Sequence, residues 1–411
     1  MKTDLDSLMQ TGNIDVLLVT GPVLHNPFMR YLTGGGHISQ ADLIKRRGQP
    51  AVLFHGPMER DEAAKTGLEI RSYSQYPYSE LLKEVGGDRL KAMALRYQRM
   101  LTDLEIDSGR VGLYGQMDLG HGYAIFNMLQ ENMPGLTLVG YQEDDLLMTA
   151  MMTKDEEEIR HIRDMGKLTT DVVGQVADFL CNHRAKDEVL VKSDGEPLTI
   201  GEVKHRIMLW VAERGAETPE DTIFAIGRDA GVPHSSGNPQ DLIRLGQTIV
   251  FDFYPCEAGG GYFYDFTRTW CLGYAPEEAQ QLYEQVLSVH QAITSEIKVN
   301  TPFVHYQQRT CELFESMGHP TIQSQPTTEI GYVHSVGHGV GLFIHERPAS
   351  GIASSPSDIL APGVVVTIEP GLYYPERGLG VRLEDTLAIL PDGKVEVLAP
   401  YPMELVLPIK K

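Results

Sequence analysis

The sequence predicts an α+β protein in which a smaller α/β domain precedes a larger domain built from two copies of one α+β unit. Three observations support this prediction. The chain has 411 residues, more than one typical domain contains. Residues 1–150 alternate short apolar runs with helix-like runs. In residues 151–411, two helical patterns followed by strand patterns occur twice in succession, so we place the domain boundary between residues 150 and 151.

The first domain is expected to be a small α/β unit. Short apolar runs bounded by turn residues predict buried strands at 14–20 and 51–54. Helices are predicted at 58–66 and 78–85. Three consecutive glycines at 34–36 are not followed by a Lys-Ser or Lys-Thr pair, so they indicate an ordinary turn and not a phosphate-binding loop.

The second domain is expected to open with a helix at Thr153, where Glu156 would complete a capping box. Apolar residues keep one face of this helix from residue 159 to 179. A second helix is expected from Thr199, by the same capping signature, to Gly215. Strands are then predicted at 222–226, 248–253 and 262–271.

The same order of elements then repeats. A helix is expected over 276–297, and another over 301–318 with Pro302 in its first turn. Strands are predicted at 332–336, 364–369 and 381–390. This repetition indicates a duplicated α+β unit, and a functional site at the junction of its two halves.

Composition narrows the classes of partner. The chain carries 35 Lys and Arg against 56 Asp and Glu, a net charge of −21, so nucleic acids and anionic membrane surfaces are not expected partners. No apolar run is long enough to span a bilayer, and the acidic N-terminal sequence does not resemble a signal peptide. The four cysteines show no spacing typical of a zinc ribbon or a disulfide framework. A soluble cytoplasmic protein is expected.

Five potential metal ligands occur in the strand-rich parts of the second domain, in the order Asp252, Asp265, His338, Glu369 and Glu384. Each lies in a short apolar run next to glycine or proline, which is typical of a strand beside a turn. Burying four carboxylates together would be prohibitive without compensating positive charge. Two divalent cations would supply that charge, and oxygen ligands with one imidazole suit Mn, Co or Zn.

These residues lie in sequence blocks that resemble the creatinase/aminopeptidase P/prolidase group of M24-type metallopeptidases. The blocks are D…GYFYDFTRT, HSVGHGVGLFIHE, EPGLY and VRLED, within a resemblance that covers about residues 153–405. A weaker match, RYLTGG, lies near residue 30. The chain departs from the family pattern after Asp252, where Phe253 and Tyr254 replace the usual spacing to a glycine and the loop to Asp265 is slightly longer.

The resemblance implies a creatinase-like N-terminal domain over 1–150 and a catalytic domain of the pita-bread fold over 151–411. It also implies cleavage of the peptide bond before proline in short peptides, by an Xaa-Pro aminopeptidase or an Xaa-Pro dipeptidase. Two divalent ions, with Mn favoured over Co or Zn, would be bound by a cytoplasmic protein that forms a homodimer.

Particular roles can be expected for the matching residues. Asp265 and Glu384, each with two carboxylate oxygens, would bridge the two ions. Asp252 would complete the ligands of one ion; His338 and Glu369 would complete those of the other. Glu369 would also carry a proton from the attacking water to the leaving amine.

Four further residues are expected around the substrate. The resemblance implies that His234, His334 and His345 line the substrate pocket, with His234 and His345 binding the substrate carbonyl and stabilising its oxyanion. Arg382, two residues before Glu384, is expected to orient the carboxylates.

Two other functions remain open at this point. The same ligands occur in hydrolases of non-peptide amides, and the same fold occurs in metal-free binding modules. Methionine aminopeptidases share the ligands but usually lack an N-terminal domain of this kind. Five histidines on predicted helices are expected to be structural, namely His161, His183, His205, His290 and His305.

Overall fold

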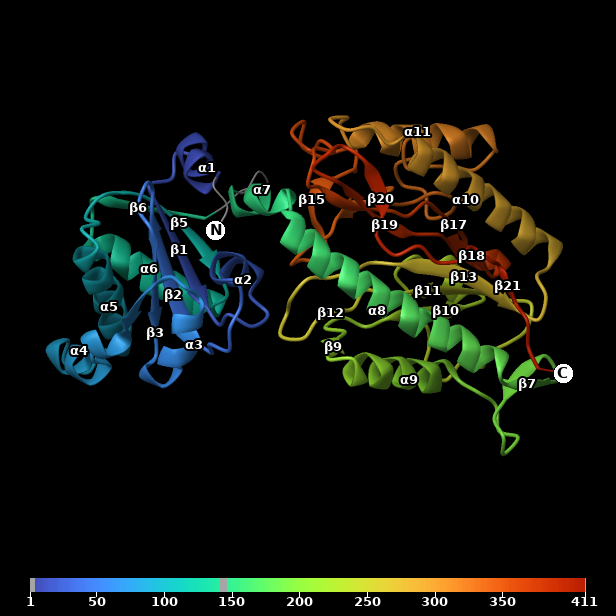
Figure 1. The fold of residues 1–411 in the computed structure, drawn as a ribbon, viewed down its shortest axis with the longest axis horizontal. Coiled ribbons are helices and arrows are strands. Elements are labelled where there is room, and N and C mark those ends of the chain that lie inside the picture. Colours follow the sequence, from blue (N-terminus) through green and yellow to red (C-terminus); the bar gives the residue numbers. More distant parts are fainter. Residues whose placement is uncertain (1–3, 141–145, 411) are drawn as a thin grey trace. The chain divides into compact units, whose positions relative to one another are not determined.

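The computed structural model describes residues 4–140 and 146–410, in two compact units (Figure 1). One unit comprises Met1–Ala150 with Gly259–Gly261, and the other comprises Met151–Ala258 and Tyr262–Lys411. Residues 1–3, 141–145 and 411 of the two predicted domains lie outside the described residues. Both units combine helices with sheets, so the predicted α+β class is confirmed.

The first unit is built on a mixed six-stranded sheet in the order β4-β3-β2-β1-β5-β6. Its strands are β1 Val16–Gly21, β2 Ala41–Arg46, β3 Ala51–His55, β4 Glu69–Ser72, β5 Gly109–Gly115 and β6 Leu136–Val139. The helices that begin in this unit are α1 Leu5–Thr11, α2 Pro27–Thr33, α3 Arg60–Lys65, α4 Tyr78–Glu84, α5 Arg89–Asp103, α6 Leu119–Asn132 and α7 Leu146–Met152. The predicted strands correspond to β1 and β3, and the predicted helices to α3 and α4. The predicted glycine turn is the end of α2, where Gly34 adopts a left-handed conformation with φ 76°.

The second unit begins with two amphipathic helices, α8 Glu156–Cys181 and α9 Ile200–Glu213. The capping box of α9 is the predicted one, formed by Thr199 and Glu202. The predicted start of α8 is wrong by two residues, because Asp155 and Glu158 form its capping box. Thr153 is instead extended and bridges to Val364.

The first half of this unit places α8 and α9 with a sheet in the order β10-β11-β13-β21. These strands are β10 Ile223–Ile226, β11 Thr248–Asp252, β13 Thr267–Leu272 and β21 Val406–Leu407. Two short pairs accompany them: β7 Arg184–Lys186 with β8 Val189–Val191, and β9 Ala216–Glu217 with β12 Cys256–Glu257. The strand predicted at 262–271 begins only at Thr267, since the preceding residues form the loop that carries Asp265.

The second half places α10 Glu277–Glu296 and α11 Val304–Ser316 with a sheet in the order β15-β14-β16-β19-β20. Its strands are β14 His338–Gly339, β15 Glu346–Ala349, β16 Val365–Ile368, β19 Asp385–Ile389 and β20 Val395–Val397, and β17 Gly371–Tyr374 pairs separately with β18 Leu379–Arg382. The duplicated order of two helices and then strands is therefore confirmed.

Three details of the second half differ from prediction. Pro302 precedes Phe303, the N-cap of α11, and so lies outside the first helical turn. Residues 332–336 make only an isolated bridge at Tyr332 and form no strand. The single strand predicted at 381–390 is divided into β18 and β19, because the chain leaves one sheet for another at Glu384.

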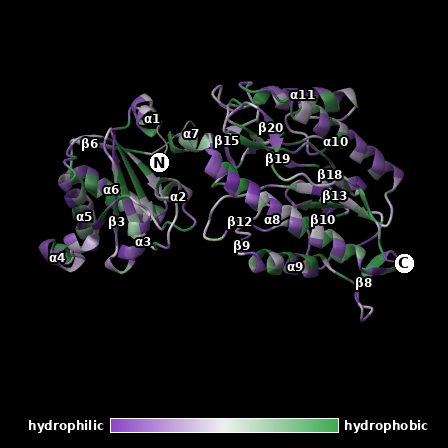
Figure 2. Ribbon diagram, in the orientation of Figure 1, coloured by the Kyte–Doolittle hydropathy of each residue, from purple (hydrophilic) through white to green (hydrophobic). Residues whose placement is uncertain are grey.

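The two halves meet where β13 lies beside the break between β18 and β19. The backbone N–H of Glu384 donates to the carbonyl of Thr267 at 3.1 Å, and Thr269 Oγ1 donates to the carbonyl of Arg382 at 2.9 Å. Figure 2 shows polar and apolar residues along α8, as expected for a helix with one buried face. Within residues 4–140 and 146–410, no helix combines the length and the apolar character that a bilayer span requires.

Candidate metal centre and substrate cavity

The structure brings all nine predicted site residues to one cavity of about 610 Å³ within the second unit. The residues come from segments that are far apart in sequence and belong to both halves of the duplicated unit. They are Asp252, Asp265, His338, Glu369, Glu384, His234, His334, His345 and Arg382.

Strand ends position the five predicted ligands. Asp252 is the last residue of β11, and Asp265 lies two residues before β13. His338 opens β14, and Glu369 immediately follows β16. Glu384 occupies the break between β18 and β19. A strand end lets a polar side chain leave the apolar interior of the sheet while the backbone stays hydrogen-bonded, so each group is held firmly at the cavity.

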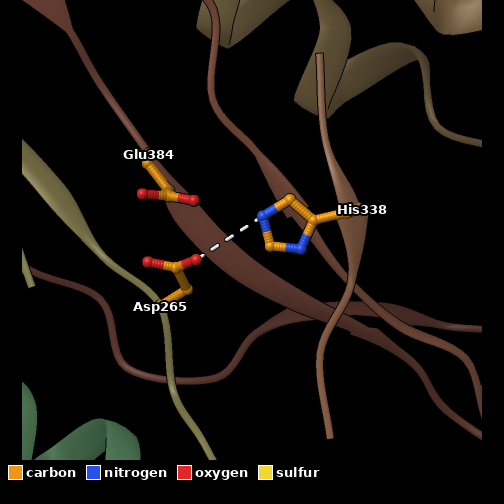
Figure 3. A group of neighbouring side chains, drawn as sticks. All are labelled: Asp265, His338 and Glu384. Carbon is orange, nitrogen blue, oxygen red and sulfur yellow. Dashed lines mark ion pairs between the residues drawn. The ribbon is translucent and has the colours of Figure 1, made fainter. Parts of the chain in front are cut away.

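Three of these side chains form a tight group. The ligand atoms of Asp265, His338 and Glu384 all lie within 4.8 Å of one another, and the side chains point toward a common centre (Figure 3). Nε2 of His338 lies 3.5 Å from Oδ2 of Asp265. Nδ1 of His338 lies 3.1 Å from the carbonyl oxygen of Gly339, which can only accept a hydrogen bond. Nδ1 therefore carries the proton, and Nε2 directs its lone pair at the carboxylates.

Glu369 and Asp252 lie at the edge of this group. Oε1 of Glu369 is 3.4 Å from Nε2 of His338. One oxygen of Asp252, Oδ2, accepts a hydrogen bond of 2.6 Å from the buried guanidinium of Arg382. The longer loop after Asp252 therefore does not remove this residue from the cavity.

Burial and mutual repulsion make these carboxylates costly to ionise in the absence of cations. Burial, followed by the charges of Asp252 and Glu369, raises the pKa of Asp265 well above its usual value. Burial, followed by the charge of Asp265, has the same effect on the pKa of Glu384. Burial raises the pKa of Glu369 to about 8, against the opposing effect of Arg382. Burial also lowers the pKa of His338 to about 3, so its imidazole is neutral.

The donor set fits divalent cations. Two buried carboxylate oxygens, Oδ1 of Asp252 and Oε1 of Glu384, have no hydrogen-bond partner among the described residues. Buried polar atoms without partners are uncommon and indicate a group that the site is built to hold. Here they accompany a neutral imidazole and further carboxylates, the ligands that Mn, Co and Zn accept. Bound cations would also offset the repulsion that raises the carboxylate pKa values.

Arg382 connects two parts of the site. Besides Asp252, its guanidinium donates to the hydroxyl of Tyr373 at 2.7 Å. That hydroxyl lies 2.8 Å from Nε2 of His334, whose Nδ1 lies 2.7 Å from the carbonyl of Ser335. Arg382 thus donates to Tyr373, and Tyr373 donates to His334. Both ring nitrogens of His334 are already engaged within the protein.

His345 and His234 are placed differently from His334. The ring of His345 packs edge-on against His338, with centroids 4.4 Å apart. Burial lowers the pKa of His345, so its imidazole is neutral near pH 7. His234 is exposed in the turn after Gly231. The ring nitrogens of both histidines lack hydrogen-bond partners within the described residues and remain available to a substrate.

Sequence reasoning missed several residues of this cavity. Eight further residues line it: Glu220, Asp221, Ile223, Pro233, Ser236, Tyr254, Ser335 and Ile344. Tyr373 accepts a hydrogen bond from Arg382, and Thr267 donates one to Glu384. Tyr373 and Thr267 both lie inside the motifs that predicted the ligands. Glu220 and Asp221 belong to no motif, so only the folded structure shows that they line the cavity.

Other polar groups lie away from the cavity. Glu257, an acidic residue near Asp252 in sequence, forms a short contact of 2.5 Å with the ring of His161. That ring also stacks on Tyr262. His183 follows the end of α8, whereas the other histidines predicted on helices lie within α8, α9, α10 and α11. None of these residues lines the cavity.

The glycines beside His338 have a packing role. A Cβ atom on Gly337 would lie 2.0 Å from the carbonyl oxygen of Thr367, and one on Gly339 would lie 2.2 Å from that of Arg347. Only glycine permits these close approaches. The glycines therefore hold β14 between β15 and β16, which fixes the backbone that carries His338.

Two curated peptidases are similar to this chain in sequence. The chain is 28% identical over 404 residues to the uncharacterized peptidase YqhT of Bacillus subtilis, covering 98% of both chains. It is 29% identical over 251 residues to an Xaa-Pro dipeptidase of Pyrococcus furiosus, covering 61% of this chain and 64% of that protein.

A solved structure shares the fold over almost the whole chain. The Xaa-Pro dipeptidase of Bacillus anthracis superposes with a TM-score of 0.76 at 22% identity, covering 98% of this chain and 97% of the other. The second unit has the pita-bread fold. The model of metallopeptidase family M24 matches residues 160–391, which contain all five predicted ligands, and the chain belongs to this family.

Proposed function

We propose that this metallopeptidase hydrolyses the peptide bond before proline in short peptides, with two divalent ions bound at the cavity. The proposal is carried by the meeting of nine predicted residues at one cavity, where two buried carboxylate oxygens have no hydrogen-bond partner in the described part of the chain. The preference for proline is supported by the names of the relatives from P. furiosus and B. anthracis. We also propose a cytoplasmic homodimer, in which residues 1–150 form a creatinase-like domain.

Five residues would hold the ions. These are Asp252, Asp265, His338, Glu369 and Glu384, whose carboxylate oxygens and imidazole nitrogen all reach the cavity. When bound, the ions would polarise the scissile carbonyl and lower the pKa of water. Manganese is the favoured metal because carboxylate oxygens dominate the donor set.

The chain's own groups would move the proton and stabilise the developing charge. Glu369 would accept the proton of the attacking water and deliver it to the leaving amine of proline. The rings of His345 and His234 would donate hydrogen bonds to the carbonyl oxygen as it becomes negative. Arg382 would hold Asp252 in place through their 2.6 Å hydrogen bond.

The charges of the cavity favour removal of an N-terminal residue from peptides longer than a dipeptide. Among the described residues that line it, Arg382 is the only lysine or arginine, and its guanidinium already bonds Asp252 and Tyr373. A free C-terminal carboxylate therefore meets no unengaged lysine or arginine in this part of the chain. The dipeptidase reading is the second candidate, and it is favoured by the names of the relatives.

Metal content tests the dinuclear centre. Protein stripped with a chelator, reloaded with Mn and desalted should contain two ions per chain, because the cavity offers five ligand residues. Elemental analysis measures this ratio. The matched control is His161→Ala, which removes a histidine outside the cavity and should also bind two ions. Fewer than one ion per wild-type chain would exclude the dinuclear mechanism.

A small peptide series tests the substrate. Mn-loaded enzyme should cleave Ala-Pro-Ala before proline, leave Ala-Ala-Ala almost intact, and tolerate an amide in place of the C-terminal carboxylate of Ala-Pro. Product formation can be followed by chromatography. Cleavage of Ala-Pro alone would establish the dipeptidase reading. If metals bind but no proline peptide is hydrolysed, a hydrolase of non-peptide amides becomes the better explanation.

A further inference from the structure

A buried ion pair that does not line the cavity includes Glu346, the residue after His345. Nζ of Lys154 is 2.7 Å from Oε2 of Glu346, and each side chain is only 1% exposed. A buried pair of this kind is costly to desolvate and often contributes little net stability. Its presence therefore calls for a role other than general stability.

The carboxylate of Glu346 organises the turn that precedes it. Its second oxygen, Oε1, accepts hydrogen bonds from the backbone N–H groups of Leu342 at 2.7 Å and Phe343 at 3.0 Å. A Cβ atom on Gly341 would lie 2.4 Å from the same carboxylate, so the turn is closed tightly around it. Glu346 thus serves as the template on which residues 341–345 fold.

This turn carries His345 and starts close to His338. The two rings contact each other with centroids 4.4 Å apart. His345 directly precedes Glu346, so a shift of the carboxylate would move the ring within the cavity. Lys154 keeps the carboxylate in place and is itself fixed by its backbone, whose N–H donates to the carbonyl of Gly363 at 2.7 Å.

We propose that Lys154 and Glu346 form a positioning pair, which holds the 341–345 turn so that His345 faces the substrate carbonyl. The pair touches neither substrate nor metal. It acts through His345, and this inference rests on the proposed function. Loss of the pair should lower kcat without removing metal, because His338 keeps its hydrogen bonds to Thr367 and Gly339.

The test is a double-mutant cycle in the full-length, metal-loaded enzyme. Lys154→Met and Glu346→Gln should each lower kcat by about tenfold or more on the peptide that wild-type enzyme cleaves best, with metal content and KM nearly unchanged. Lys154→Arg, which keeps the charge, should restore most of kcat. In a His345→Ala background, Lys154→Met should cause no further loss, since the group it positions is gone.

Several outcomes would overturn the proposal. The first is an unchanged kcat in Lys154→Met. The second is loss of bound metal from that variant. The third is a further fall in kcat, as large as in the wild-type background, when Lys154→Met is added to His345→Ala. If Lys154→Met does not fold, the double variant Lys154→Met/Glu346→Gln, in which both charges are removed, takes its place in the cycle.

Hydrogen exchange is a second measurement of the same turn. Exchange at the amides of Leu342 and Phe343 should be faster in Glu346→Ala than in wild-type protein.

The exchange measurement also separates this inference from the proposed function. If wild-type enzyme cleaves no peptide, the proposed function fails, and exchange alone decides whether the pair holds the turn. Unchanged protection of the two amides in Glu346→Ala would reject the positioning role. A matched control is Arg163→Met, which breaks a partly exposed pair with Glu396 and should change neither kcat nor exchange in the turn.

Discussion

Replacing Asp252 by Asn is expected to reduce peptidase activity by about 10³-fold, at the upper end of the effect of removing one electrostatic group from a catalytic centre. Asn has nearly the same shape but no charge, so it is a much poorer ligand for a hard cation. The unpartnered Oδ1 would lose its value as a ligand atom, and the buried guanidinium of Arg382 would lose its charged partner. The metal content should fall below two ions per chain.

Elemental analysis and kcat/KM, measured on the same preparation, check this prediction. The matched control is Glu257→Gln, because that carboxylate lies near in sequence but pairs with His161 outside the cavity. The control should keep both ions and wild-type turnover. Thermal unfolding would establish that both variants are folded. If Asp252→Asn keeps two ions and full activity, Asp252 is not a ligand.

Replacing His345 by Ala is expected to lower kcat by about 10²-fold while both metal ions remain bound. The ring lies against His338, but its nitrogens have no partner within the described residues, so it is free to donate to the substrate. Its lowered pKa keeps the imidazole neutral, the form that donates one hydrogen bond without adding charge near the cations.

Comparison of kcat, KM and metal content separates a substrate role from a metal role. A loss confined to kcat indicates that the ring acts in the transition state. His161→Ala is the matched control, since that ring contacts Glu257 and Tyr262 away from the cavity. Loss of an ion from His345→Ala would instead make His345 a metal ligand.

The sequence by itself determined the features that depend on neighbouring residues. The capping box at Thr199 and the apolar face of α8 are local patterns, because caps and helical faces involve residues within about one turn of each other. The five candidate ligands could also be named, since each lies in a short motif whose residue types are themselves the chemical signal. The duplicated order of helices and strands could also be predicted, because each helix and strand has its own local pattern of apolar residues.

Some local readings failed because several patterns fitted the same segment. Thr153 and Asp155 both precede a Glu three residues later, and only the pairing of Thr153 with Val364 shows that the helix starts after Asp155. Residues 381–390 contain enough apolar residues to be predicted as one strand. The change of sheet at Glu384 depends on partners elsewhere in the chain.

The tertiary structure alone decided how the site is assembled. Arg382 and Asp252 are 130 residues apart and meet because β11, β13 and β18 lie side by side. The same pairing brings Thr267 to Glu384, and the fold places Glu220 and Tyr254 along the cavity. Strand register and sheet order arise from packing between distant segments, and no local pattern of residues encodes them. The motifs therefore named the candidate residues, and the folding of two half-units against each other brought them to one cavity.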